Sequence, residues 1–336
     1  MKLKKPHLLT FGALALVMPA SADVIYSNLQ DIAIPATFDG LYLNVETGAW
    51  NTPSNLGAGV AGWDVNPFSG GKAFANSPAF QPVRSGTGSS SPILNLAAGV
   101  TVGSGSPYST FVQGPTGETP GAPGYGGSQM LTGSGGNFTA GTEGYLGFRL
   151  NGTNYGSMRV VLTNNTSGAM IKDWAYDDTG AAIKTDWIKT DIVSPTARTV
   201  TLNPGTGDSF TLGSVLADAS GSITNSVLKT GDGTTVLSQT NTYTGATNVN
   251  VGTLVINGST STSSAVTVAN GAALGGSGAI GGAVTIQAGG TSPPATALRA
   301  LPQETLPFSP ARPSPRKSTS PPHWDFRETS PPPPDH

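Results

Sequence analysis

The sequence predicts an all-β protein, with an N-terminal antiparallel β-sandwich, a short parallel β-helix and a disordered, Pro-rich tail. Apolar residues alternate with polar ones in several short segments, and a later repeat places a glycine at a fixed offset after an apolar pair. No window keeps the 3.6-residue period of an amphipathic helix. The chain has 46 glycines and only 11% charged residues, against about 25% in an average soluble protein. We therefore expect many short strands joined by tight turns.

The first 22 residues have the pattern of a secretory signal peptide. A lysine-rich start precedes an apolar run over residues 8–18, and an Ala-Ser-Ala site ends at Ala22. Cleavage after Ala22 would leave a mature chain that begins at Asp23. The run is shorter than the ~20 residues needed to cross a bilayer, although an uncleaved anchor remains an alternative. We expect an exported protein, extracellular or at the cell surface, with no transmembrane segment once the signal is removed.

Residues 23–190 are predicted to form the sandwich. Two alternating apolar segments flank Asn151-Gly152, a dipeptide that suits the positive φ of a hairpin turn. The apolar faces of these two segments comprise Leu146, Phe148 and Leu150, and Met158, Val160 and Leu162. Within this domain, residues 85–136 are rich in Gly, Ser, Pro and Thr, which predicts a flexible surface excursion or a functional loop.

The next region, residues 228–290, follows a different pattern. Val266-Thr-Val268 recurs as Val284-Thr-Ile286, and each apolar pair is followed by a glycine turn. Short strands of this kind bury their apolar side only when they stack as coils, which predicts a parallel β-helix. Residues 191–227 would be a linker or the first coils.

One coil of this region carries a family resemblance. Residues 228–258 read LKTGDGTTVLSQTNTYTGATNVNVGTLVING. The segment resembles the autotransporter-associated β-strand repeat, with its K-T-G-x-G-T, N-T-Y-T-G-x-T-x-V and G-T-L-x-V-N-G parts. The matching residues are Lys229, Thr230, Gly231, Gly233, Thr234, Asn241, Thr242, Tyr243, Thr244, Gly245, Thr247, Val249, Gly252, Thr253, Leu254, Asn257 and Gly258. The resemblance implies a β-helical, passenger-like stalk of an exported bacterial protein, without catalytic residues.

A second resemblance concerns residues 144–183. GYLGFRLNGTNYGSMRVVL, followed by IKDWAYDDTGAAI, is similar to the β-rich ectodomains of bacterial PEP-CTERM proteins. Such proteins usually carry a short C-terminal sorting signal, and neither Val-Pro-Glu-Pro nor an apolar span with a basic end occurs in this sequence.

Residues 291–336 break the glycine-rich pattern. They hold about half of the 27 prolines and no glycine. One interpretation is a Pro-rich linker. The other is a frameshift or sequencing error, because codons for residues 291–298 read two bases later can encode L-S-P-G-N-S-P, which commonly follows Gly-Gly-Thr in the resembled repeat proteins. We expect disorder over residues 292–336, since proline cannot donate a ladder hydrogen bond.

The composition excludes several kinds of chemistry. There is no cysteine, and the three histidines are His7, His323 and His336. Residues 23–290 therefore cannot assemble a Ser-His-Asp triad or a His-ligated metal site. A net charge of -2 provides no basic field for nucleic acid. We expect no cofactor and no nucleic-acid partner.

Three weaker site interpretations stay open. Trp63, Trp174 and Trp187 could offer ring faces to a sugar or belong to the core. The acidic turn over residues 177–180 is either solvated or a Ca²⁺ ligand set, although it lacks EF-hand spacing. Paired carboxylates could act as a glycosidase. The available carboxylates are Glu46, Asp64, Glu143, Asp173, Asp177 and Asp178.

Two functions follow from these observations. The first is a noncatalytic exported protein of the cell surface or extracellular matrix, structural or adhesive, with surface glycans or matrix components as partners. The alternative is a carbohydrate-binding or carbohydrate-cleaving sandwich in which Trp63, Trp174 and Glu143 line a groove. The sequence leaves the oligomeric state open.

Overall fold

The computed structural model describes residues 23–53, 59–88, 91–109, 127–219, 222–292 and 299–300. The predicted signal peptide, its cleavage site after Ala22 and most of the Pro-rich tail lie outside these residues. Every regular element in the described ranges is a β-strand, which confirms the all-β prediction. None of these elements is an apolar helix of the length that a membrane crossing requires.

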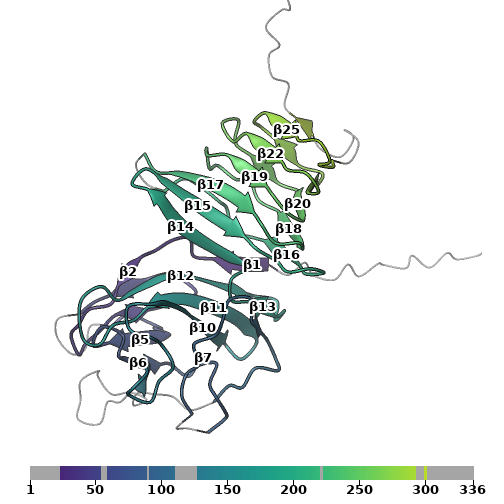
Figure 1. Ribbon diagram of the computed structural model, residues 1–336. Helices are drawn as coiled ribbons and strands as arrows, with labels where there is room; N and C mark the ends of the chain where they lie inside the picture. Colours follow the sequence, from purple (N-terminus) through teal and green to yellow (C-terminus); the bar gives the residue numbers. More distant parts are fainter. Residues whose placement is uncertain are drawn as a thin grey trace, which may run out of the picture. The chain divides into compact units, whose positions relative to one another are not determined.

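The N-terminal region is a sandwich of two antiparallel sheets (Figure 1). The strands of the longer sheet that belong to the sandwich are β1 (Asp23–Tyr26), β2 (Ile32–Ala33), β7 (Phe80–Pro82), β10 (Glu143–Leu150), β11 (Asn154–Val161) and β12 (Met170–Asp177). The shorter sheet contains β3 (Tyr42–Leu43), β4 (Trp50–Asn51), β5 (Val65–Phe68), β6 (Ala73–Asn76) and β9 (Ser128–Gln129). A separate two-stranded ribbon pairs β8 (Thr101–Val102) with β13 (Ile183–Lys184).

Alternation along the strands explains the sandwich core. In β10, Leu146, Phe148 and Leu150 are all fully buried, because every second side chain of a strand points to the same face. They join one apolar cluster with residues of the shorter sheet, such as Leu43 and Phe74. The two sheets are therefore held together mainly by apolar packing.

The hairpin predicted at Asn151-Gly152 is present. Strands β10 and β11 pair antiparallel from Glu143↔Val161 to Leu150↔Asn154. The turn places Asn151 at a φ of 52° and Gly152 at a φ of 80°. Asparagine and glycine tolerate this left-handed region better than other residues do, which is why the dipeptide identified the turn.

The C-terminal region is a parallel β-helix with three faces (Figure 1). The first face stacks β15 (Ala197–Leu202), β17 (Thr224–Lys229), β19 (Thr247–Val249), β22 (Val266–Val268) and β25 (Val284–Ile286) in parallel. The second stacks β16 (Ser209–Leu212), β18 (Thr234–Leu237), β20 (Thr253–Ile256) and β23 (Ala273–Gly275). The third contains β21 (Ser259–Thr260), β24 (Ala279–Ile280) and β26 (Arg299–Ala300).

The β-helix begins before the resembled repeat. Strands β15 and β16 pair in parallel with β17 and β18, so they belong to a coil and not to a linker. Strand β14 (Ile188–Ser194) pairs antiparallel with β15 and covers the first rung of that face. Residues 191–227, for which the sequence left two interpretations, thus contain the first coil.

One sheet runs through both regions. Strand β1 pairs antiparallel with β12 of the sandwich and in parallel with β16 of the β-helix. As a result the strand order β23-β20-β18-β16-β1-β12-β11-β10-β7 is continuous. The sandwich and the coil are joined by backbone hydrogen bonds as well as by the connecting chain.

Of residues 292–336, predicted to be disordered, the structure describes Ser292, Arg299 and Ala300, and the last two form a strand. Strand β26, Arg299–Ala300, pairs in parallel with β24 and continues the third face. Neither residue is a proline, so both can take part in a ladder. Thr291 also forms a bridge to Ala273. The last coil therefore extends past the point at which the glycine-rich pattern stops.

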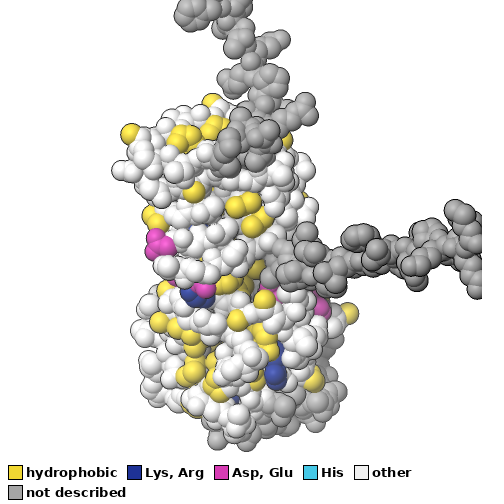
Figure 2. Space-filling view, turned by 90° about the vertical axis from the view of Figure 1, so that its right-hand side faces the viewer, with side chains coloured by type: hydrophobic (Ala, Val, Ile, Leu, Met, Phe, Trp, Pro, Cys, Tyr) yellow, Lys and Arg dark blue, Asp and Glu magenta, His cyan; other side chains and the backbone are white. Residues whose placement is uncertain are grey.

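The outer surface of the coils is almost without charge. No Asp, Glu, Lys or Arg occurs between residues 233 and 292. Figure 2 shows one face of the molecule, and no charged side chain colours its upper part, where the last coils lie. Backbone pairing and a buried aliphatic core, which includes Leu254, Ile256 and Val268, hold these coils together.

Glycines occur where consecutive coils approach most closely. A Cβ on Gly258 would lie 2.0 Å from the carbonyl oxygen of Gln239 in the preceding coil. At Gly252, with a φ of +69°, an added Cβ would lie 2.3 Å from the carbonyl oxygen of Gly231. The obstacles are backbone atoms, so neither position can accept a side chain without moving a coil.

The substitution Gly258→Ala should lower the free energy of unfolding by about 2 kcal/mol, because the added methyl overlaps fixed backbone. The matched control is Gly275→Ala, where the nearest atom to the new Cβ is Val255 Cγ2 at 3.9 Å. That control should cause no loss, since alanine also restricts the unfolded chain. Urea denaturation of both variants tests the prediction, and equal losses would contradict it.

Candidate functional site

The structure separates the three residues predicted to line a sugar-binding groove. Trp174 lies in β12 and is only 4% exposed, and its indole N–H donates to the Val45 carbonyl at 3.0 Å. The alternation of β12 turns this ring into the sandwich core. A buried ring has no face free for a sugar, so Trp174 is a core residue. Trp187 is also buried and stacks on Phe210, with ring centroids 5.0 Å apart.

Trp63 and Glu143 lie on different sheets. Trp63 is half-buried just before β5 and meets Tyr42 edge to face, with ring centroids 5.5 Å apart. Glu143 begins β10 in the longer sheet, and its side chain, 37% exposed, lies 3.4 Å from the Arg159 guanidinium. The groove expected from Trp63, Trp174 and Glu143 is therefore not formed by these residues.

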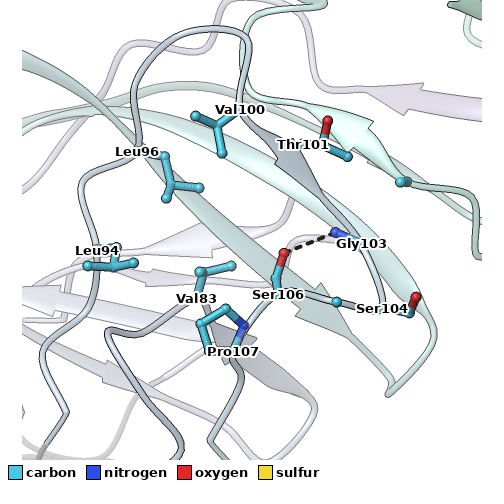
Figure 3. A pocket seen from close by; sticks show the side chains of 11 residues that line it. Val83, Leu94, Leu96, Val100, Thr101, Gly103, Ser104, Ser106 and Pro107 are labelled. Atoms are coloured by element: carbon cyan, nitrogen blue, oxygen red, sulfur yellow. Dashed lines mark hydrogen bonds between the residues drawn. The ribbon is translucent and has the colours of Figure 1, made fainter.

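A cavity of about 520 Å³ lies elsewhere in the sandwich (Figure 3). Its walls are mostly aliphatic, and the loop around Gly103 closes one side, where the Ser106 hydroxyl accepts a hydrogen bond from the Gly103 N–H at 3.2 Å. The lining residues are Val83, Leu94, Leu96, Val100, Thr101, Gly103, Ser104, Gly105, Ser106, Pro107 and Ala182. The lining contains no charged and no aromatic residue. It can hold an aliphatic group, but it supplies neither an acid–base pair nor a ring for sugar stacking.

Asp64 is the carboxylate whose environment most resembles that of a catalytic acid. Burial raises its pKa to about 6, and the nearby charge of Glu46 acts in the same direction. Asp64 is only 3% exposed, however, and its carboxylate accepts the Val45 N–H at 2.7 Å. A general acid must reach its substrate, so the arrangement favours a structural role for Asp64.

The acidic turn over residues 177–180 is organised by its first residue. Asp177 Oδ1 accepts the Thr179 N–H at 2.9 Å, the Thr179 hydroxyl at 2.7 Å and the Ala181 N–H at 2.8 Å. These bonds form a turn in which the carboxylate caps its own loop. Across the described ranges, no three His, Cys, Asp or Glu side chains gather in a way that could hold a metal ion. The Ca²⁺ interpretation of this turn therefore receives no support from its geometry.

The strongest polar cluster surrounds Arg159 on β11. This side chain is almost completely buried and forms two hydrogen bonds with Asp173 of β12, at 3.0 and 2.6 Å. It also contacts Asp191 of β14 at 2.6 Å and Glu143 at 3.4 Å, and it donates to the Thr190 carbonyl. One guanidinium thus connects three strands of the sandwich, β10, β11 and β12, to the strand that covers the first rung of the β-helix.

The remaining groups of this cluster complete its hydrogen bonding. The Tyr26 hydroxyl of β1 donates to Asp173 at 3.0 Å and lies 2.6 Å from the Thr190 hydroxyl. Burial by itself lowers the pKa of the Arg159 guanidinium, but the hydrogen bonds and charge of Asp173 outweigh burial and raise it. Burial acts to raise the pKa of Asp191, but the hydrogen bond and charge of Arg159 hold it below its usual range. Arg159 and Asp191 therefore stay charged at neutral pH.

Lys229 belongs to the interior of the β-helix. Its side chain is fully buried, and its Nζ donates to the carbonyls of Gly231 in its own coil and Val251 in the next, the latter at 3.2 Å. Burial lowers the pKa of this amine to about 8. The Lys-Thr-Gly part of the repeat motif therefore places a hydrogen-bond donor where two coils turn.

Asn241 and Tyr243 connect coils in a similar way. The Asn241 side chain accepts the Leu216 N–H at 2.9 Å and donates to the Ser259 carbonyl at 3.2 Å. The buried Tyr243 hydroxyl lies 2.6 Å from the Thr247 hydroxyl, which lies 3.0 Å from that of Ser264. The motif residues are structural, since they satisfy buried polar groups between coils.

Sequence reasoning missed Arg159 and Lys229. A signal was present for Lys229, which stands at a buried position of the alternating strand β17. Arg159 lies on the face of β11 opposite Met158 and Val160, so alternation alone did not mark it as buried. A charged residue at a buried position requires a buried partner. Only the fold reveals that these partners come from Asp173 and from the carbonyls of neighbouring coils.

Replacing Arg159 by methionine should lower the free energy of unfolding by about 3–5 kcal/mol, because Asp173 would remain buried without its cation. The control is Lys172→Met, which removes a more exposed pair with Asp31 at 3.4 Å and should cost about 1 kcal/mol or less. Chemical denaturation of both variants measures the two losses. Similar small losses would show that the Arg159 cluster does not brace the fold.

Asp64→Asn should raise stability at pH 7.5 and have less effect near pH 4. The folded pKa, about 6, exceeds the reference value of 3.8, so ionisation of Asp64 destabilises the fold as pH rises through this window. Asparagine can still accept the Val45 N–H but does not ionise. We expect a gain of about 1–3 kcal/mol at pH 7.5. Denaturation at both pH values measures it, and an equal effect at both would contradict it.

A comparison with protein families identifies a passenger-type repeat within the parallel coils. The family model of the passenger-associated-transport-repeat matches residues 227–256, which run from β17 to the end of β20. The match does not extend to the N-terminal domain, so it adds nothing to the PEP-CTERM resemblance. Comparisons with curated proteins and with solved structures find no match. The chain thus contains one repeat of a kind associated with autotransporter passengers, which supplies β17 and β18 of one coil and β19 and β20 of the next.

Proposed function

We propose that the protein is a noncatalytic, exported component of the cell surface or extracellular matrix, with a structural or adhesive role. The observation that carries the proposal is the passenger-type repeat at residues 227–256, which forms one coil of the β-helix and part of the next. The lysine-rich start and apolar run within residues 1–22 add an independent indication of export.

The construction of the coils suits a stalk. The inner rungs pair their backbones with the rungs on both sides. The buried side chains of Lys229, Asn241 and Thr247 add hydrogen bonds between neighbouring coils. Stability of this kind is distributed along the repeat and does not depend on a single core. The sandwich is held at the start of the coil by the continuous sheet, where it can present a surface to glycans or matrix components.

The carboxylates support the noncatalytic part of the proposal. Asp64 and Asp173 are buried, Asp177 caps its own turn, and Glu143 pairs with Arg159. None of these four residues lines the aliphatic cavity. The carbohydrate alternative would have to depend on Trp63, since Trp174 lies in the core.

Export can be tested by expressing the full chain in a Gram-negative host. We expect the mature protein to begin at Asp23 and to be digested by protease added to intact cells or recovered from the medium. A chain without residues 2–22 is the matched control and should stay inside the cell. Mass spectrometry of the N-terminus and cell fractionation provide the measurement. An uncleaved precursor in the cytoplasm would contradict the proposed export.

A glycan panel separates the leading proposal from the alternative. Saturable glycan binding that Trp63→Ala abolishes without loss of folding would favour the carbohydrate-binding function. Attachment of protein-coated beads to matrix components, unaffected by Trp63→Ala, would favour the adhesive role.

A further inference from the structure

The last rung of the first face exposes residues that elsewhere form the core. Val284 and Ile286 of β25 are each 39% exposed, whereas Val266 and Val268, their partners in β22, are 0% exposed. The register shows that both pairs occupy the same columns of the β-helix. In the described part of the chain, no strand pairs with β25 on the side away from β22.

The backbone of β25 has hydrogen-bonding groups directed outward. Ala283 accepts the Val266 N–H at 2.8 Å, and Gln287 donates to the Val268 carbonyl at 2.9 Å, so the odd-numbered residues bond to β22. Because bonding direction alternates along a strand, Val284 and Ile286 direct their N–H and C=O groups away from the coil. The outer edge of β25 can therefore form backbone hydrogen bonds with one further strand.

We propose that two copies of the protein associate end to end by antiparallel pairing of β25 with β25 of a second copy. With Thr285 opposite Thr285 on the two-fold axis, Val284 of each copy faces Ile286 of the other. These two pairs would exchange N–H···O bonds in both directions, and the Thr285 pair would be the close, non-hydrogen-bonded one. All four apolar side chains would then lie on the inner face, since directly opposed residues share a face.

Charge supports a second copy as the occupant. Edge strands are commonly protected from pairing by charges or bulges, but residues 233–292 contain no charged side chain. Two copies can therefore approach along β25 without repulsion between charges on that strand; Arg299 of β26 belongs to the third face. The other edge of the same sheet is protected, because β14 has a bulge between Ile192 and Ser194 and an ion pair between Lys189 and Asp191 at 3.4 Å.

The fold also limits the assembly to two chains. The first rungs are covered by β14 on one face and by β1 on another. Among the coil strands that the structure describes, only β25 ends a face with exposed core residues, so the contact uses the same patch on both copies. An interface of this kind closes as a dimer and does not propagate as a fibre.

A cysteine placed on the two-fold axis tests the geometry directly, because the chain has no cysteine of its own. Thr285→Cys in the full chain should form a covalent dimer under mild oxidation, since Cα atoms of a close antiparallel pair are about 4.5 Å apart and a disulfide can bridge this separation. The matched control is Thr267→Cys, in register with Thr285 but one rung farther from the interface. It should remain monomeric on a non-reducing gel.

Light scattering of the unmodified chain should show a mass of two chains at high concentration, with little dependence on salt because β25 carries no charge. Ile286→Lys should give one chain with an unchanged melting profile, since this side chain is already partly exposed. Val193→Lys, on β14 at a side chain that is 65% exposed, should leave the dimer intact. A monomer at every concentration, an open-ended oligomer, equal cross-linking of both cysteine variants, or dissociation by Val193→Lys alone would overturn the proposal.

Discussion

The pairing of β1 is the interaction on which the rest of the structure depends. This four-residue strand lies between β12 and β16, so its removal would divide the long sheet into a sandwich part and a coil part. It begins at Asp23, immediately after the predicted cleavage site. Removal of a signal peptide would therefore leave the strand that joins the two regions at the very start of the mature chain. The long sheet would then become continuous only when these first residues of the mature chain pair with β12 and β16.

The Arg159 cluster secures the same junction with different chemistry. Backbone pairing of β1 sets the distance between the sandwich and the first coil, and Arg159 then connects Asp173 of β12 with Asp191 of β14. Buried ion pairs stabilise a fold only modestly when compared with apolar packing, because desolvation offsets much of their attraction. A buried ion pair nevertheless requires its charged groups to lie at hydrogen-bonding distance and in the right orientation. We infer that the cluster mainly selects one arrangement of β14 over the sandwich.

The two regions achieve stability in contrasting ways. The sandwich packs large apolar residues, such as Phe74 and Phe148, between its sheets. The β-helix encloses a narrow core of mainly aliphatic residues, such as Leu254 and Ile256, and adds close backbone contacts, with glycines at positions where an added Cβ would overlap the preceding coil. A surface almost free of charge follows from this second design. It leaves β25 without the charges that usually block pairing.

The sequence alone determined the all-β class, the hairpin at Asn151-Gly152 and the stacked coils, because these features depend on local periodicity and on turn residues. It also identified the passenger-type repeat, whose short motif is specific. Only the tertiary structure decided that Trp174 belongs to the core, that Arg159 and Lys229 are buried with partners, and that β1 joins the two regions. Those outcomes depend on which distant strands become neighbours. The alternation of apolar and polar residues predicts which side chains point inward. The residues that they contact there depend on the pairing of segments more than a hundred residues apart, such as β1 and β12.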